Sequence, residues 1–275
     1  MSKLDDTPTE QLLQHAATVA AKDATREADE RWALVWALHS RGEESVFQAA
    51  EAWCADASPL LRCLGADVLG QLGYDDDHPF DARSLPALVR QLDDPEAVVV
   101  SCALVAMGHL RIGDPDAVCA LARHESAEVR HSVAYCLGGR DDELSLTTLV
   151  GLSKDPDGEV RDGATFALGE LSEHDSPMVR EALALRLGDE DEVVRLEAMR
   201  GLASRGDARA IPVILACLEN DSVDSLAVEA AAEFPDARFV KPLELLLGAN
   251  PGDEDIKTAL ECCQALGASP GSRTQ

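Results

Sequence analysis

The chain has 275 residues, of which 46% are hydrophobic and only 4% aromatic, and its 51 acidic and 24 basic residues give a formal net charge of -27 at pH 7. A surface of this charge repels phosphate backbones and anionic lipid headgroups, so the composition argues against binding of nucleic acid or of a membrane surface. A chain that is rich in alanine and leucine and poor in aromatic residues is typical of closely packed helices.

The N-terminal residues and the cysteines indicate the cellular compartment in which the protein is expected. Residues 1–6 lack a basic region followed by an apolar core, and no apolar run approaches the length of a membrane span, so neither a secretory signal nor a transmembrane helix is expected. None of the eight cysteines forms a Cys-x-x-Cys motif, and most lie in helical, alanine-like contexts. We therefore expect free thiols in a cytoplasmic protein, rather than a zinc site or disulfides.

Residues 7–21 predict the first helix. Thr7 can cap it, Pro8 suits its first position and Glu10 completes a capping box. Apolar residues at helical spacing follow. We expect this helix to cover the N-terminal end of a repeat array, because a terminal unit has no neighbour on its outer side.

A repeated pattern fills the chain from about residue 25 to residue 267. Its clearest copy is the stretch Asp155-Pro-Asp-Gly-Glu-Val-Arg-Asp-Gly-Ala-Thr-Phe-Ala-Leu-Gly169, an acidic turn followed by Val-Arg and a Leu-Gly ending. When the copies are aligned on the residue equivalent to Gly169, these aligned positions lie 30 to 38 residues apart: His39, Gly70, Gly108, Gly138, Gly169, Ala203, Pro235 and Gly267. The residue before each aligned position is large and apolar in every copy, which indicates a buried helix face.

Each copy predicts two helices. Helix A carries the Val-Arg pattern and usually ends at the aligned glycine, which we expect in the left-handed conformation that closes many helices. Helix B often opens with Asp-Ala-Arg, as at Asp81, Asp207 and Asp236, where the aspartate can cap the helix. One pair cannot bury both of its faces, so the pairs should stack into a continuous core, with small residues of helix A allowing close approach.

This pattern resembles the HEAT-repeat family, specifically the short HEAT repeats named after phycobilisome lyases. The resemblance covers roughly residues 31–267 and is carried by the Asp155–Gly169 stretch and the helix B opening Asp207-Ala-Arg-Ala-Ile-Pro212. It implies an all-α fold, an α-solenoid in which about seven HEAT-type helix pairs form a right-handed superhelix behind an N-terminal capping helix, with the B helices on the concave side. We expect a single domain over residues 1–267, with repeats at about 25–267, and a disordered tail at 268–275.

Helix A carries an arginine in five copies. Because its spacing repeats with the fold, we expect a structural role, in which the planar fork reaches an acidic side chain or a turn carbonyl of an adjoining copy. The five residues are Arg31, Arg62, Arg130, Arg161 and Arg195.

Catalytic and metal sites find little support. The deoxyhypusine hydroxylases, which are HEAT-type di-iron enzymes, carry His-Glu pairs at helix A positions where this chain has one histidine, His131, and no such pair. The chain also lacks a P-loop, a dinucleotide fingerprint and a Gly-x-Ser-x-Gly motif. We expect no enzyme activity, no cofactor, no metal and no small-molecule substrate.

Two features predict a partner-binding surface. The first is an insertion in the longest copy, because insertions in repeat arrays project from one face, often the binding one. Its candidate contact residues are Tyr74, Asp75, Asp76, Asp77, His78 and Phe80. Phe80 has the alternative role of stapling onto helix B. The second feature is a set of helix B side chains that lie off the leucine stripe and are expected on the concave side, namely Arg90, Arg123, Arg180, Arg209 and Arg238.

Trp32 and Trp36 share one helix face. They either pack beneath the N-terminal helix or form an aromatic contact patch, since tryptophan is enriched at interface hot spots.

The sequence therefore favours a non-enzymatic module that binds a protein partner with a basic patch on its concave surface, such as a bacterial adaptor or a toxin-immunity protein. The alternative, which comes from the resemblance, is a chromophore lyase or lyase subunit like the phycobilisome enzymes. For that role His131, Tyr135 and Cys136 are the nearest cluster of polar groups.

Overall fold

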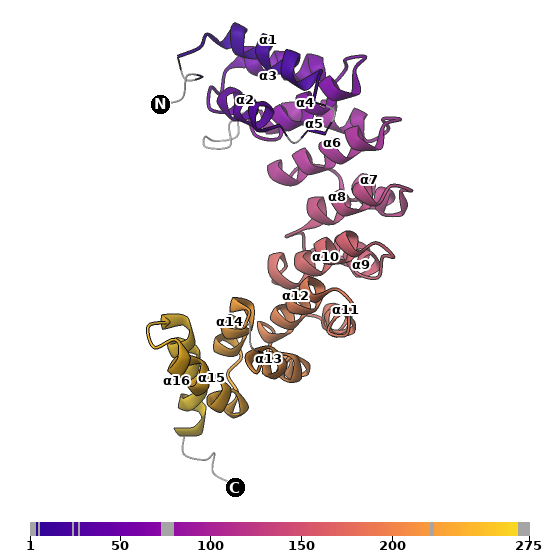
Figure 1. The fold of residues 1–275 in the computed structure, drawn as a ribbon. Coiled ribbons are helices and arrows are strands. Elements are labelled where there is room, and N and C mark those ends of the chain that lie inside the picture. Colours follow the sequence, from indigo (N-terminus) through magenta and orange to yellow (C-terminus); the bar gives the residue numbers. More distant parts are fainter. Residues whose placement is uncertain are drawn as a thin grey trace. The chain divides into compact units, whose positions relative to one another are not determined.

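The computed structural model in Figure 1 describes residues 4, 6–23, 25–26, 28–72, 80–220 and 223–268, and within these ranges it contains helices and no strands. The chain divides into two compact units, residues 1–138 and 139–275. The predicted all-α solenoid fold is confirmed, whereas the single domain over 1–267 and the hand of the superhelix stay predictions. The tail, apart from residue 268, lies outside the described residues.

The first unit consists of alternating B and A helices. Within this unit, neighbouring A helices pack on one another, and each A helix packs on the B helix that precedes it. The predicted N-terminal helix forms and packs against α2, α3 and α4. In the described part of this unit the helices are α1 (Thr9–Ala20), α2 (Asp29–His39), α3 (Glu44–Trp53), α4 (Pro59–Leu69), α5 (Asp81–Gln91), α6 (Ala97–Leu110), α7 (Pro115–Ala120) with the 3₁₀ turn Leu121–Arg123, and α8 (Ala127–Leu137).

The second unit repeats this arrangement, with even-numbered A helices and odd-numbered B helices. Its A helix α10 ends in a π-helical turn, and two of its B helices begin with 3₁₀ turns. The elements are α9 (Glu143–Leu152), α10 (Gly158–Phe166) with the π-helix η2 (Ala167–Leu171), α11 (Pro177–Arg186), α12 (Glu192–Ala203), η3 (Ala208–Ala210), α13 (Ile211–Leu218), α14 (Ser225–Glu233), η4 (Ala237–Phe239), α15 (Val240–Ala249) and α16 (Glu254–Ala268).

The apolar column of the sequence repeat forms the core of each unit. Six of its members have no exposed surface: Leu38, Leu69, Met107, Leu137, Leu168 and Leu202. The last member, Leu266 on α16, is instead 54% exposed. The buried members explain why this position stays large and apolar along the repeat.

The aligned glycines have a different role from the predicted one. The φ angles of Gly70 and Gly138 are -68° and -56°, so neither residue is left-handed. A Cβ atom on Gly70 would lie 2.7 Å from the Cα atom of Ala106 on the next A helix. The expectation of left-handed helix ends was wrong here, because it is the short distance between neighbouring A helices that requires glycine.

The predicted aspartate caps form at two of three positions. The Asp207 carboxylate accepts a hydrogen bond from the backbone N–H of Arg209 (3.0 Å), and Asp236 caps η4 in the same way. Asp81 is itself the first residue of α5, and the residue at the N-cap position of α1 is Pro8 rather than Thr7. Although the caps of α1 and α5 differ from the predicted ones, the helices follow one another along the chain in the predicted order.

The arginine column links successive repeats. Arg62 donates two hydrogen bonds to the Asp94 carboxylate, at 2.7 and 2.8 Å, and a further one to the backbone carbonyl of Asp56. Arg161 makes the same forked contact with Asp189, at 3.0 Å for both bonds. The predicted structural role is confirmed for Arg62 and Arg161, whose forks each join one acidic turn to the next. Arg195 instead donates to the carbonyls of Asp189 and Glu190, in the turn before its own helix.

Candidate protein-binding surfaces

Among the predicted insertion residues, Tyr74 to His78 lie outside the described residues. Phe80 is described and is only 6% exposed. Its ring stacks on that of Phe47, with centroids 5.2 Å apart, and the Arg83 guanidinium lies over the Phe47 ring at 4.1 Å. Phe80 therefore staples α5 to α3, which is the second of the two roles that the sequence allowed.

The predicted helix B arginines do not converge on one site. Arg209 pairs with Asp207 at 2.7 Å and Glu181 at 2.6 Å, and Arg238 pairs with Asp236 at 2.7 Å. The hydrogen bonds from Arg209 keep the pKa of Asp207 down at about 2. The charges of these arginines are therefore largely matched by carboxylates of their own or the preceding repeat.

The three remaining helix B arginines differ from one another. Arg180 pairs with Asp175 at 2.6 Å and also donates to the backbone carbonyl of Arg205. Arg90 and Arg123 are exposed and make no hydrogen bond or ion pair within the described ranges. Partner binding by these five arginines stays a prediction, for which Arg90 and Arg123 are the most available.

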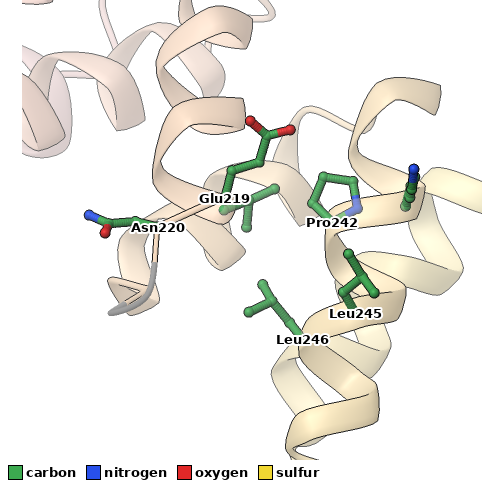
Figure 2. A pocket seen from close by; sticks show the side chains of 7 residues that line it. Glu219, Asn220, Pro242, Leu245 and Leu246 are labelled. Atoms are coloured by element: carbon green, nitrogen blue, oxygen red, sulfur yellow. The ribbon is translucent and has the colours of Figure 1, made fainter.

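An open apolar groove lies between α13 and α15 (Figure 2). Its volume is about 480 Å³. Leu245 projects toward it and is 68% exposed, more than any other large apolar side chain of the described residues. The lining residues are Leu218, Glu219, Asn220, Lys241, Pro242, Leu245 and Leu246. The groove thus presents a leucine-rich floor with one acidic and one basic residue among its lining.

Sequence reasoning missed this groove, although a signal was present. Residues 243–247 read Leu-Glu-Leu-Leu-Leu, which is more leucine than one buried helical stripe needs. Leu243 is completely buried, whereas Leu245 points away from the core. The run therefore serves both the core and an exposed surface.

A second feature lies on the A helices of the second unit. We define the A-helix carboxylate cluster as the side chains of Asp162, Glu170, Glu197, Glu229 and Glu233, which interact electrostatically with one another around Arg200. The two terminal nitrogens of Arg200 lie 3.2 Å from a Glu170 oxygen and 3.5 Å from a Glu229 oxygen. One guanidinium therefore bridges two members of the cluster.

A polar hollow of about 340 Å³ adjoins this cluster and includes Glu170, Arg200, Arg205 and Glu233 in its lining. The Arg205 guanidinium donates hydrogen bonds to backbone carbonyls, including those of Gly201 (2.7 Å) and Leu168 (2.8 Å). It closes the C-terminal ends of two neighbouring A helices. Arg205 therefore stabilises the wall of the hollow and makes no hydrogen bond to the cluster among the described contacts.

Glu197 is the most perturbed member of the cluster. Burial, with the nearby carboxylates of Glu170 and Asp162 adding to it, raises the pKa of Glu197 to about 7. Its Oε2 atom is buried and has no hydrogen-bond partner in the described part of the structure. The folded protein therefore holds this carboxyl group in an environment that disfavours its charge.

A Glu197→Gln variant tests this environment. Because the pKa is raised from 4.5 to about 7, the unfolded state ionises first, and wild-type stability falls as the pH rises through this window. We expect the variant to be more stable than wild type by about 1–2 kcal/mol at pH 8, after allowance for solvent screening, and equal to it at pH 4.5. Urea unfolding at the two pH values measures the difference. Equal stability at pH 8 would contradict the prediction, and Glu244→Gln, at an exposed position, is the control.

The corresponding face of the first unit contains an arginine from the loop between α1 and α2. Arg26 lies 3.5 Å from the Asp67 carboxylate and 4.0 Å from that of Glu128. Asp67 also accepts a hydrogen bond of 2.6 Å from Arg31, a side chain that is only 1% exposed. The carboxylates on this face are thus neutralised by the chain itself.

The aromatic residues of the A helices remain partly exposed. Trp32 is 43% and Trp36 61% exposed, which favours the contact-patch reading over packing beneath α1. Tyr135 is 41% exposed, and its hydroxyl lies 3.2 Å from the Nδ1 atom of His109, whereas Cys136 is 3% exposed. The tyrosine and the cysteine point in different directions from α8, so they do not converge on a chromophore cleft.

Metal ligands and helix length were the two remaining features of the described residues that concern function. Within the described ranges, no group of three or more His, Cys, Asp or Glu side chains is placed to hold a metal ion. No helix in the same ranges is both long and apolar enough to cross a membrane.

Comparison with known proteins gives a consistent result. A family model described as HEAT repeats matches residues 85–169, 115–185, 151–234 and 180–263. Protein YibA of Escherichia coli strain K12 is 28% identical over 234 residues, which is 82% of each chain. The crystal structure of that protein superposes with a TM-score of 0.71 at 24% identity, over 93% of this chain and 95% of the other. An engineered protein gives a TM-score of 0.57 at 20% identity, over 98% and 83%.

Proposed function

Since the chain belongs to the HEAT-repeat family, we propose that it is a non-enzymatic interaction module that binds a protein partner, in the manner of a bacterial adaptor or toxin-immunity protein. The observation that carries the proposal is the apolar groove between α13 and α15. A repeat array offers a broad surface on rigid helices, and function on such a scaffold depends on the site that it presents.

The groove suits an apolar side chain of a partner. Leu245 exposes 68% of its surface, and burial of a whole leucine side chain stabilises a complex by roughly 1.5–3 kcal/mol. Leu218 and Pro242 are buried and form a fixed floor, so few side chains lose freedom when the partner binds. A rigid apolar pocket with a polar rim is the usual form of an interface hot spot.

The net charge of -27 supports a partner with a basic surface. Attraction between opposite charges speeds encounter and suppresses association with acidic proteins. Exposed Arg90 and Arg123, which belong to the first unit, offer separate contacts for acidic residues of a partner.

A chromophore-lyase role has less support. It would need polar groups that converge on a cleft, and His131, Tyr135 and Cys136 all lie along one helix, with the cysteine buried.

A Leu245→Glu variant tests the proposal. The full-length chain is cross-linked in cells that naturally express it, and the partner is identified from the wild-type complex. We expect Leu245→Glu to reduce recovery of that partner at least tenfold, because a charge is then buried in an apolar contact. Leu266→Glu, at another exposed leucine, is the matched control and should bind normally. If both variants recover the same amount of the partner and their circular dichroism is unchanged, the result contradicts binding in the groove.

A further inference from the structure

The apolar groove between α13 and α15 adjoins a second hollow. This hollow has a volume of about 260 Å³ and is lined by the end of α15 and by the first turns of α14 and α16. Its floor is also apolar, because Val228 and Ile256, which are 5% and 6% exposed, belong to its lining. Leu246 points into the space beside α15 and lines both hollows (Figure 2). The two hollows together therefore form one apolar strip along α15.

The apolar strip is long enough for a short helix of another protein. Its lining begins with Lys241 in the first turn of α15 and includes Asn250, the residue that caps the end of this helix. These residues lie nine positions apart, which corresponds to about 14 Å, or two and a half turns, at a rise of 1.5 Å per residue. Apolar side chains at positions i, i+4 and i+7 of a partner helix cover most of this length.

The apolar strip consists of helix side chains and offers no row of free backbone groups. Most backbone groups of α13 and α15 are hydrogen-bonded within their own helices. An extended segment on the strip would leave its own N–H and C=O groups without partners, and the described part of the second unit has no strand whose edge it could join. A helix satisfies its own backbone and presents only side chains, so the strip favours a helical occupant.

The charged residues at the edge of the apolar strip are mostly acidic. Glu219 lies at the end of α13, and Asp253 and Asp255 lie at the start of α16, whereas Lys241 is the one basic residue in the described lining of the two hollows. All four side chains are exposed and make no ion pair among the described contacts. Carboxylates beside an apolar contact attract basic side chains of a partner and disfavour acidic ones. The edge of the strip therefore favours a helix whose apolar face is flanked by lysine or arginine.

We infer that the apolar strip binds an amphipathic helix of the protein partner, with apolar side chains in the two hollows and basic side chains beside Asp253 and Asp255. The stem of a lysine or arginine can lie on the strip while its charged end reaches these carboxylates. A second copy of this chain suits the strip less, since two chains of net charge -27 repel each other. The inference rests on the proposed function, because it assumes that a protein partner occupies the groove.

The test uses the full-length chain and three fluorescently labelled model peptides. The first is an alanine-based helix of about 16 residues, with leucine at i, i+4 and i+7 and lysine on both sides of this leucine face. The second has glutamate in place of each lysine, and the third keeps the lysines but has a central proline that breaks the helix. Fluorescence anisotropy measures binding at physiological ionic strength. We expect saturable binding of the lysine helix and at least tenfold weaker binding of the other two peptides.

Leucine variants of the chain locate the peptide. Leu245→Glu should weaken binding of the lysine helix at least tenfold, because it places a charge in the middle of the apolar strip. Leu266→Glu, at another exposed leucine, is the matched control and should change binding less than twofold.

A pair of double variants separates the acidic edge from general attraction. Asp253→Asn with Asp255→Asn should weaken binding of the lysine helix at least threefold. The α16 helix is kept, since asparagine can replace Asp253 as acceptor of the backbone N–H groups of Asp255 and Ile256. Glu143→Gln with Glu159→Gln removes the same charge from exposed first-turn positions of α9 and α10 and should change binding less than twofold.

Several outcomes would overturn the inference. These are no saturable binding of the lysine helix, equal binding of the three peptides, or equal weakening by the two double variants. If Leu245→Glu loses the cross-linked partner but one of these outcomes is found, the inference fails and the proposed function stands. If Leu245→Glu recovers the partner in full, both fail. Sedimentation of the chain alone is the last check, since a dimer that Leu245→Glu abolishes would assign the strip to a second copy and overturn the inference.

Discussion

Replacement of Asp67 by alanine is expected to destabilise the first unit by about 3–5 kcal/mol, the largest effect of any single change considered for this protein. The Asp67 side chain is 5% exposed and accepts a 2.6 Å hydrogen bond from Arg31, whose side chain is 1% exposed. Without the carboxylate, Arg31 would remain charged and buried with one more unsatisfied donor. Urea unfolding followed by circular dichroism measures the loss.

A surface ion pair provides the control for Asp67. Glu44 and Arg83 also form a short contact, 2.7 Å, but their side chains are 52% and 48% exposed. We expect Glu44→Ala to change the stability far less than Asp67→Ala does, since water solvates both groups after the surface pair is broken. If Asp67→Ala and Glu44→Ala lower the free energy of unfolding equally, burial does not determine the strength of the ion pair between Asp67 and Arg31.

Replacement of Gly201 by alanine is expected to destabilise the second unit by about 1–3 kcal/mol, and by more if the helices cannot move apart. A Cβ atom at Gly201 would lie 2.6 Å from the Cα atom of Gly169 and 3.1 Å from a methyl carbon of Leu183. The first of these atoms belongs to the backbone, so α12 and η2 must separate. Thermal unfolding measures the result as a lower Tm.

Gly248 on α15 provides the matched control for Gly201. Nothing lies within 4 Å of a Cβ atom placed there. Gly248→Ala should leave stability unchanged or raise it by up to about 1 kcal/mol, because alanine favours the helix. A Gly201→Ala variant as stable as wild type would show that the two A helices have room to separate at no cost.

The repeat made most of the fold predictable. Helical spacing and the large apolar column located the helix pairs, and the column does form the core, as at Leu69 and Leu168. The role of the glycines could not be derived in the same way. A left-handed helix end and a close helix crossing both select glycine, and only the position of Ala106 opposite Gly70 distinguishes them.

The candidate sites were less predictable because they depend on residues that are distant in sequence. The groove needs the end of α13 to lie beside the first turns of α15, which a leucine-rich run alone does not establish. The carboxylate cluster joins Asp162, Glu197 and Glu229 from three repeats. A search of the aligned repeat for charge as well as for apolarity would have found these residues, whereas the position of Arg26 follows no periodic signal.

The helix B arginines show a further limit of sequence reasoning. Their exposure was predictable from the leucine stripe, and Arg209 and Arg238 are indeed exposed. Their partners were also visible, since each follows a capping aspartate by two residues and pairs with it. An arginine in an Asp-Ala-Arg helix opening is thus better interpreted as part of the cap than as a free binding group.

Hydrogen–deuterium exchange on the complex of the full-length chain with its identified partner tests the central claim, that the second unit docks a protein in the groove between α13 and α15. We expect slower exchange in the complex at residues 218–220 and 241–246, with no comparable change at Leu266 on α16. Protection confined to residues 1–138, with the groove exchanging as in the free chain, would contradict the claim.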